Sequence, residues 1–402
     1  MSRYQDILGR INYGIFLVAF ALMPFPQIGL RYAIVLWVIS YLLEGRWLRR
    51  PLSLRDNPVA IPFILFGLWW AWKALSVCWA PDITAWTQQM ERYLTFLFIV
   101  PAGIWGLNAH YDWKQAGRVL VISCMCALPI YLSLFTTLFY HREIVDALEW
   151  KACWDYSPTT WYGFFAANVS ILKHRLYLCS VEFFGAIVAV LLYRKRPWML
   201  MHVLAVIGLL ILLSGSRQSV ITGAVLAVAG IIYWLPERYR LRYGLIAAAL
   251  GIAAAGSILF IHPRMNENRQ EDRPLIWQAA LQQPHDYIAH GVGAGQSTNY
   301  LMMRYEQEGL TECIAEHNHS HNQYLEELIE IGIGGLILFL LAWLSIPLCT
   351  PKEARWTALL FPLLFMLNMC TDCMFEMFDG VALWAACMLF IATYLSSPSR
   401  AA

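Results

Sequence analysis

Twelve apolar runs constrain the fold of this chain more than any other feature of its sequence. Each is close to the ~20 residues that an α-helix needs to cross a lipid bilayer. They lie at about 11–30, 31–45, 58–79, 92–108, 117–140, 171–193, 197–213, 217–235, 243–261, 325–348, 355–371 and 381–397. Only 14% of the 402 residues are charged, against about 25% in soluble domains. We therefore predict an all-α integral membrane protein, a single polytopic domain over residues 1–402 with about twelve transmembrane helices.

Basic residues indicate the orientation of the chain. Lysine and arginine gather in every second connection, as at 46–55 and 194–196, whereas the connection 80–91 has neither. Because positive charges are enriched on the cytoplasmic side, we expect both termini to be cytoplasmic and the connections 141–170 and 262–324 to lie outside. The net charge of +2 then reflects topology and indicates no nucleic-acid partner.

The connection 262–324 is the one large polar insertion. Pro274 is suited to the first turn of a short helix, and Ser297 begins a second, amphipathic helix that Gly309 ends. Long connections in compact proteins are usually functional or disordered, and two helices with end signals favour function. The smaller connection 141–170 is rich in aromatic residues, which is typical of a membrane interface and is also seen where sugar rings bind.

Three histidines, His317, His319 and His321, stand where this insertion meets the apolar run 325–348. Ser320 followed three residues later by Gln323 has the pattern of a capping box, which predicts a helix beginning at His321. The positive end of a helix disfavours a charged imidazole, so a neutral His321 would be able to accept a proton. Alternate spacing does not suit zinc ligation from a helix, and we expect no metal site.

Several cations lie on the same predicted outer side. Arg217 and Arg273 each stand at the head of a predicted helix, and Arg175 with His174 opens the run 171–193. Lys73, near the outer end of its run, is a weaker example. Such residues often only anchor a helix to lipid headgroups. Together with a neutral imidazole they also suit a transfer reaction in which arginines hold a departing diphosphate in place of a metal ion.

Cysteine usage leaves one alternative open. We expect the ten cysteines to be reduced packing residues. A disulfide between Cys370 and Cys373, or between Cys153 and Cys313, is the alternative in an oxidising compartment.

Three short motifs resemble the signature of the O-antigen ligase and polymerase superfamily of bacterial inner-membrane glycosyltransferases. They are His321-Asn322 followed by Gly332 and Gly335, Arg217 within Ser-Gly-Ser-Arg, and Arg273–Trp277 followed by Gly291-Val292-Gly293. The predicted spans and the large outer connection are also similar to that superfamily. The motifs cover about 217–335, and the architecture covers the whole chain.

The resemblance implies an inverting, metal-independent transfer of glycan from undecaprenyl diphosphate at the periplasmic face, with no cofactor. In the ligase, the acceptor is a sugar hydroxyl of lipid A-core. The implied base is His321, which either takes the acceptor's proton or hydrogen-bonds the diphosphate. Arg217 and Arg273, with Arg175, are the expected diphosphate-binding residues. The supporting candidates are His174, His319, Glu326 and Glu327, the two glutamates as alternative bases or as residues that orient the imidazole.

Three other functions remain open at this stage. O-antigen polymerase and protein O-oligosaccharyltransferase share the signature, and a transporter or flippase for a lipid-linked sugar belongs to another class. Polymerases tend to have two sizeable outer loops, whereas here 262–324 dominates and 141–170 is modest, which favours the ligase. Transporters usually place polar or broken helices at the midplane of the bilayer, often with internal repeats, and no repeat is visible here.

Overall fold

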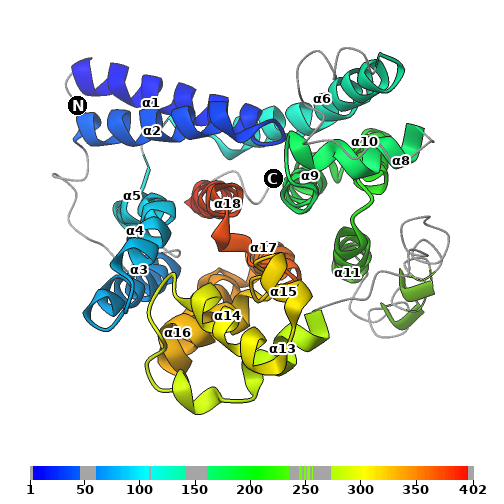
Figure 1. The fold of residues 1–402 in the computed structure, drawn as a ribbon. Helices are drawn as coiled ribbons and strands as arrows, with labels where there is room; N and C mark the ends of the chain where they lie inside the picture. Colours follow the sequence, from blue (N-terminus) through cyan, green and yellow to red (C-terminus); the bar gives the residue numbers. More distant parts are fainter. Residues whose placement is uncertain are drawn as a thin grey trace. The chain divides into compact units, whose positions relative to one another are not determined.

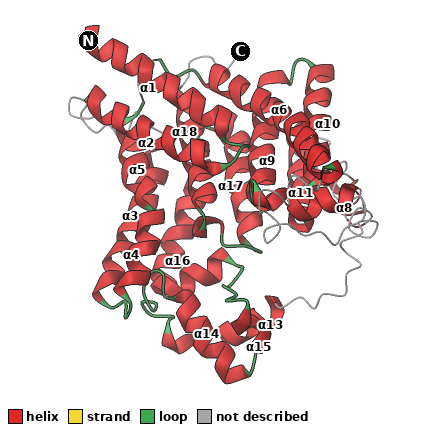
Figure 2. Cartoon of the chain, turned by 45° about the horizontal axis from the view of Figure 1, so that its top comes forward, coloured by secondary structure: helices red, strands yellow, loops and turns green. Residues whose placement is uncertain are grey.

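The structure, a computed structural model, describes residues 3–45, 60–107, 110–141, 161–234, 244–246, 249, 251–253, 256 and 273–396. Every regular element in this part of the chain is helical, as Figure 2 shows. The chain forms two compact units, and both are discontinuous in sequence. Unit 1 comprises Met1–Gly45 and Ala109–Asn268, and unit 2 comprises Arg46–Asn108 and Arg269–Ala402.

Unit 1 is built on a helical hairpin and a set of apolar helices. Helices α1 (Arg3–Leu22) and α2 (Gln27–Glu44) lie side by side (Figure 1), and the buried Asn12 joins them by donating to the Trp37 carbonyl and the Ser40 hydroxyl. The other helices are α6 (Trp113–Tyr140), α8 (Trp161–Asn168), α9 (Arg175–Tyr193), α10 (Pro197–Leu213) and α11 (Arg217–Trp234). Buried aromatic and aliphatic side chains of α6, α8, α9 and α10 form one core.

Unit 2 combines long apolar helices with a group of short ones. The first group is α3 (Ala60–Leu75), α4 (Ile83–Arg92), α5 (Leu94–Trp105), α16 (Gln323–Cys349), α17 (Arg355–Met369) and α18 (Phe378–Ser396). The second is α13 (Arg273–Leu281), α14 (Ser297–Glu308) and α15 (Thr311–Ala315), which gather around the beginning of α16 (Figure 1). Their apolar faces share a core with Leu325 and Ile329 of α16. The helices predicted from Pro274 and Ser297 are thus present, and Gly309 ends the second in a left-handed conformation.

Among the described residues, six helices are long and apolar enough to cross a membrane, as expected of a multi-pass membrane protein. They correspond to the predicted runs 31–45, 58–79, 117–140, 171–193, 325–348 and 381–397. The remaining runs are not established as spans. The run 11–30 was wrongly drawn, because α1 ends at Leu22 and α2 begins at Gln27, with Pro24 and Pro26 between them.

Helix α16 breaks at Gly332, which has φ +69° and ψ −174°. A break deprives nearby backbone groups of their partners within the helix. The turn 288–295 supplies them: Val292 N–H donates to the Ile329 carbonyl at 2.8 Å, and Gly293 N–H to the Glu330 carbonyl at 2.9 Å. Ile333 N–H in turn donates to the Ile288 carbonyl at 2.8 Å. The turn 288–295 is therefore bonded into the helix at its break.

Glycine is required where this turn meets the helix. Gly291 has φ +80°, and a β-carbon there would lie 2.1 Å from the Glu330 carbonyl oxygen. At Gly332 a β-carbon would lie 2.8 Å from the Ala289 carbonyl oxygen. Both contacts are far closer than real β-carbons make, so the two backbones approach this closely only because neither residue has a side chain.

Candidate functional site

The histidine segment 317–322 lies in unit 2, between α15 and the first turn of α16. The helix begins at Gln323, and its N-cap is Asn322, whose side-chain oxygen accepts from the backbone N–H groups of Tyr324 and Leu325. The predicted capping box at Ser320 is therefore wrong. The histidines stand just before the positive end of α16 and outside the helix itself.

Ser320 instead ties the histidine segment to the rest of unit 2. Its hydroxyl donates to Glu326 Oε2 at 2.5 Å, and its backbone carbonyl accepts from Trp277 Nε1 at 2.8 Å. Ser320 is fully buried. Ser320 thus holds the segment between His319 and His321 in place, through one contact to α16 and one to α13.

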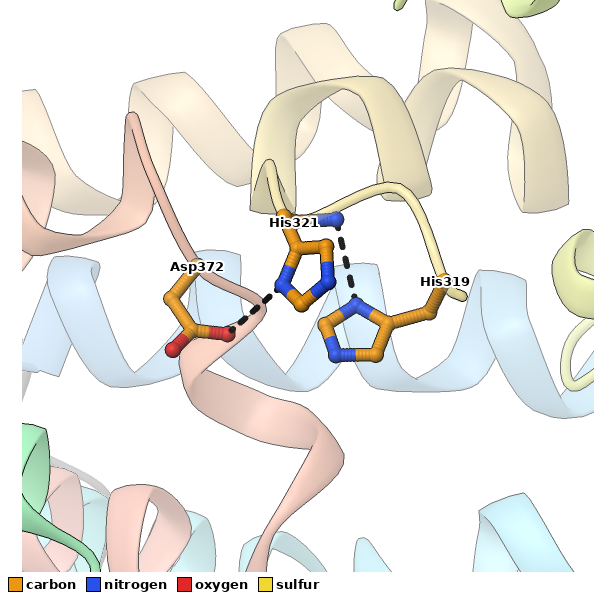
Figure 3. A group of neighbouring side chains, drawn as sticks. All are labelled: His319, His321 and Asp372. Carbon is orange, nitrogen blue, oxygen red and sulfur yellow. Dashed lines mark hydrogen bonds and ion pairs between the residues drawn. The ribbon is translucent and has the colours of Figure 1, made fainter. Parts of the chain in front are cut away.

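His321 has a left-handed backbone, with φ +47°, and faces Asp372 (Figure 3). Its Nδ1 lies 3.9 Å from Asp372 Oδ1, and both side chains are partly exposed, at 26% and 21%. Asp372 follows α17 and also accepts from the Cys373 backbone N–H at 2.9 Å. A non-glycine residue with positive φ is uncommon and marks a position where the surroundings impose the conformation.

His319 lies against His321 (Figure 3). The backbone N–H of His321 donates to His319 Nδ1 at 3.1 Å, and the two ring centroids are 4.0 Å apart. Burial lowers the pKa of His319, and the charges of His321 and Arg273 act in the same direction. Arg273, the first residue of α13, therefore lies within electrostatic range of the histidine pair. The structure brings together three of the residues that the sequence singled out.

Beneath the histidines, Glu326 is fully buried and accepts hydrogen bonds on both carboxylate oxygens. Ser297 of α14 donates to one oxygen, and Ser320 donates to the other. The Cys373 thiol lies 3.7 Å from the second oxygen. Glu326 therefore links α14, α16 and the histidine segment through the two serines. A role in orienting the imidazole stays a prediction.

Glu327 and Glu330 form a buried charge cluster with Lys73 of α3. The lysine Nζ lies 3.1 Å from Glu327 Oε1 and 2.5 Å from Glu330 Oε2, and all three side chains are fully buried. Trp69 and Gln323 donate to the Glu327 carboxylate as well, both at 2.8 Å. Lys73 thus pairs with these carboxylates, and both oxygens of Glu327 have partners within unit 2.

Residues 202–340 match the family model described as O-antigen ligase. This segment is similar to the O-antigen ligase family. The matched O-antigen ligase segment runs from α10 into α16 and contains Arg217, Arg273 and the histidine segment. Lys73 and Asp372 lie outside it. No curated protein matches the chain.

The O-antigen ligase segment spans both units, and its cations divide between them. Arg217 is exposed and opens α11 in unit 1, while Arg273 opens α13 in unit 2. Arg175, the first residue of α9, also belongs to unit 1, with His174 as the N-cap of that helix. The structure therefore does not place Arg217, Arg175 or His174 relative to His321, and their roles stay predictions.

Asp372 is the site residue that sequence reasoning missed. It follows α17, far along the chain from the O-antigen ligase motifs, and only a cluster of cysteines marked its surroundings. Cys370 and Cys373 are free thiols, as are the other cysteines in the described ranges, and Cys153 lies outside those ranges. Burial raises the pKa of both thiols, although only Cys373 is fully buried and Cys370 is exposed.

His319, His321 and Asp372 also bring three metal-ligand atoms within 4.8 Å of one another. Two imidazoles and a carboxylate are a suitable ligand set for a divalent transition metal. The His321 backbone N–H already uses the lone pair of His319 Nδ1, so a metal ion at that nitrogen would have to replace this hydrogen bond. Our expectation of a metal-free site stays a prediction.

Proposed function

We propose that this protein is an O-antigen ligase. It would transfer O-antigen glycan from undecaprenyl diphosphate to a sugar hydroxyl of lipid A-core, at the periplasmic face of the bacterial inner membrane. One observation carries this proposal: His321 faces Asp372 just before a helix that is long and apolar enough to cross a membrane, and the charge of Arg273 acts on the neighbouring His319. This arrangement combines a base, a group that orients it and a cation for an anionic leaving group.

In the proposed reaction, His321 Nε2 removes the proton from the acceptor hydroxyl. The acceptor oxygen then forms a bond to the anomeric carbon as the bond from that carbon to the diphosphate oxygen breaks. The electron pair of the broken bond stays on the diphosphate, and the anomeric configuration inverts. Arg273, together with Arg217 and Arg175, would stabilise the charge on the departing diphosphate.

The decisive experiment compares His321→Ala with His317→Ala. His317 is a matched control because it also has a left-handed backbone, with φ +51°. Purified variants are supplied with lipid-linked glycan and lipid A-core in EDTA. We expect His321→Ala to lose transfer by roughly 10²–10⁴-fold, the usual contribution of a general base, and His317→Ala to stay near wild type.

Other results of this transfer assay would contradict specific parts of the proposal. Full activity of His321→Ala would contradict the catalytic assignment. Loss of wild-type transfer in EDTA, restored by zinc or magnesium, would contradict the metal-independent mechanism. Extension of a lipid-linked acceptor in place of lipid A-core would identify a polymerase, and flipping of the donor with no transfer at all would favour a transporter.

A further inference from the structure

We propose that His319 is a hydrogen-bond donor to the diphosphate leaving group, held in the tautomer opposite to that of the base His321. This inference rests on the proposed function. It assigns the two neighbouring imidazoles different tasks, one accepting a proton and the other donating a hydrogen bond. Each task follows from what the Nδ1 atom of that ring contacts.

The tautomer of His319 is set by a backbone group. A neutral imidazole has one N–H and one bare nitrogen, and the partner of one nitrogen determines the state of the other. The His321 backbone N–H donates to His319 Nδ1 at 3.1 Å, so Nδ1 must be the bare nitrogen. The single proton of neutral His319 is then on Nε2, which becomes a donor and cannot act as a base.

The tautomer of His321 is biased by the charge of a carboxylate. Its Nδ1 lies 3.9 Å from Asp372 Oδ1, beyond hydrogen-bond distance, and the negative charge on that side favours a proton on Nδ1. The proton of neutral His321 is therefore on Nδ1, and its Nε2 has a free lone pair. This is the tautomer that removal of a proton from the acceptor hydroxyl requires.

The two rings are close enough to serve one reaction. Their centroids are 4.0 Å apart, with the planes inclined at 41° (Figure 3). In an inverting transfer the entering and the leaving oxygen lie on opposite sides of one anomeric carbon. A base and a donor separated by a few ångströms match these two oxygens.

His319 must stay neutral to keep this division of tasks. Its burial and the charge of Arg273 lower its pKa, and a proton taken up by His321 acts in the same direction, against the opposite influence of Glu326 and Asp372. The net lowering keeps the ring neutral near pH 7. A charged ring would need a proton on Nδ1 as well, facing the backbone N–H that now donates to it.

Two substitutions separate the proposed role from a structural one. His319→Gln places an amide N–H near the position of Nε2 but removes the acceptor at Nδ1. His319→Asn places a carbonyl oxygen near the position of Nδ1 and so keeps the acceptor, but it removes the donor at Nε2. We expect His319→Asn to lose about 10²–10³-fold in kcat, as for removal of a transition-state donor, and His319→Gln to lose less than about 10-fold.

The reverse order, with Asn more active than Gln, would show that His319 only supports the backbone of His321. Wild-type activity in both variants would also overturn the proposal. A rise in KM for the donor without a fall in kcat would point to ground-state binding alone, and this result too counts against it.

A second measurement does not depend on activity. Nitrogen-15 NMR of histidine-labelled wild-type protein in bilayers distinguishes bare from protonated ring nitrogens. We expect the signals lost in His319→Asn to show a bare Nδ1 and a protonated Nε2, and those lost in His321→Ala to show the reverse. A protonated Nδ1 in His319 would overturn the proposal, whereas absence of glycan transfer in wild type would overturn the proposed function and leave these tautomers as observed.

Discussion

At the scale of the residue, the site depends on a backbone conformation that histidine seldom adopts. His321 has φ +47°, a region that costs an L-residue roughly 1–2 kcal/mol. The contacts of its neighbours hold it there, through Ser320 on one side and the Asn322 cap on the other. In this backbone conformation the His321 ring faces Asp372, and this gives Asp372 a testable role.

Replacing Asp372 with asparagine should slow transfer without weakening donor binding. An amide can direct an N–H toward His321 Nδ1, which would favour the tautomer that cannot act as base. We expect kcat to fall about 10²-fold with little change in KM for the donor. The control is Glu312→Gln, an exposed carboxylate of α15. Unchanged kcat in Asp372→Asn would exclude the orienting role.

The lowered pKa of His319 predicts a dependence of stability on pH. The folded protein binds this proton more weakly than the unfolded chain, so the free energy of unfolding falls as pH drops below about 6.5, the ordinary histidine value. Above that pH, the contribution of neutral His319 to the free energy of unfolding is fully present. Thermal unfolding in detergent between pH 5 and pH 8 measures it.

The informative quantity is the loss of unfolding free energy on acidification, compared between wild type and His319→Asn. Burial raises the pKa of Glu376, and this adds a slope of opposite sign that both proteins share. We expect the variant to lose less stability on acidification. Parallel curves would mean that His319 is not a source of the acid sensitivity.

At the scale of the element, α16 is a helix in two parts, and the break at Gly332 fixes how the loop helices meet it. The sequence motif singled out Gly332 and Gly335 but did not predict the break, because the groups that bond to it are in the turn 288–295. The N-cap of α16 was mispredicted for a similar reason. Ser320 has the right pattern, yet Trp277 and Glu326 engage it, and Asn322 caps the helix instead.

A methyl group at Gly332 should destabilise unit 2. Alanine would have to adopt φ +69°, and its β-carbon would meet the backbone at Ala289 and His290. We expect the free energy of unfolding to fall by about 2–4 kcal/mol. Gly334→Ala is the matched control, since its β-carbon would have nothing within 4 Å. Equal melting temperatures for the two variants would contradict this account of the break.

At the scale of the whole molecule, each unit is assembled from segments that are distant in sequence. In unit 2, Lys73 of the first segment pairs with Glu327 and Glu330 of the second. Composition and apolar runs were sufficient to predict a multi-pass helical protein. They could not predict this pairing, because the lysine and the two glutamates are separated by more than 250 positions. Lys73 therefore resembled an anion-binding residue until its partners were known.

Lys73→Met should be strongly destabilising, because it leaves two buried carboxylates without their cation. Loss of one partner of a buried ion pair typically costs about 3–5 kcal/mol. We expect the double variant Lys73→Met with Glu330→Gln to recover part of that loss. Unfolding of the purified variants in detergent provides the comparison. A double variant less stable than Lys73→Met would show that Glu330 stabilises the fold independently of the lysine.

The turn 288–295 has a consequence for how substrates reach the site. Its N–H groups satisfy the carbonyls of Ile329 and Glu330 inside an apolar helix, and its own carbonyl at Ile288 accepts from Ile333. Lifting the turn would expose all of these groups at once, each at a cost of about 1–3 kcal/mol. We therefore expect the turn to stay bonded to α16 and not to open as a gate. In the proposed reaction, both lipid-borne substrates would approach the histidines by a route that leaves the turn in place.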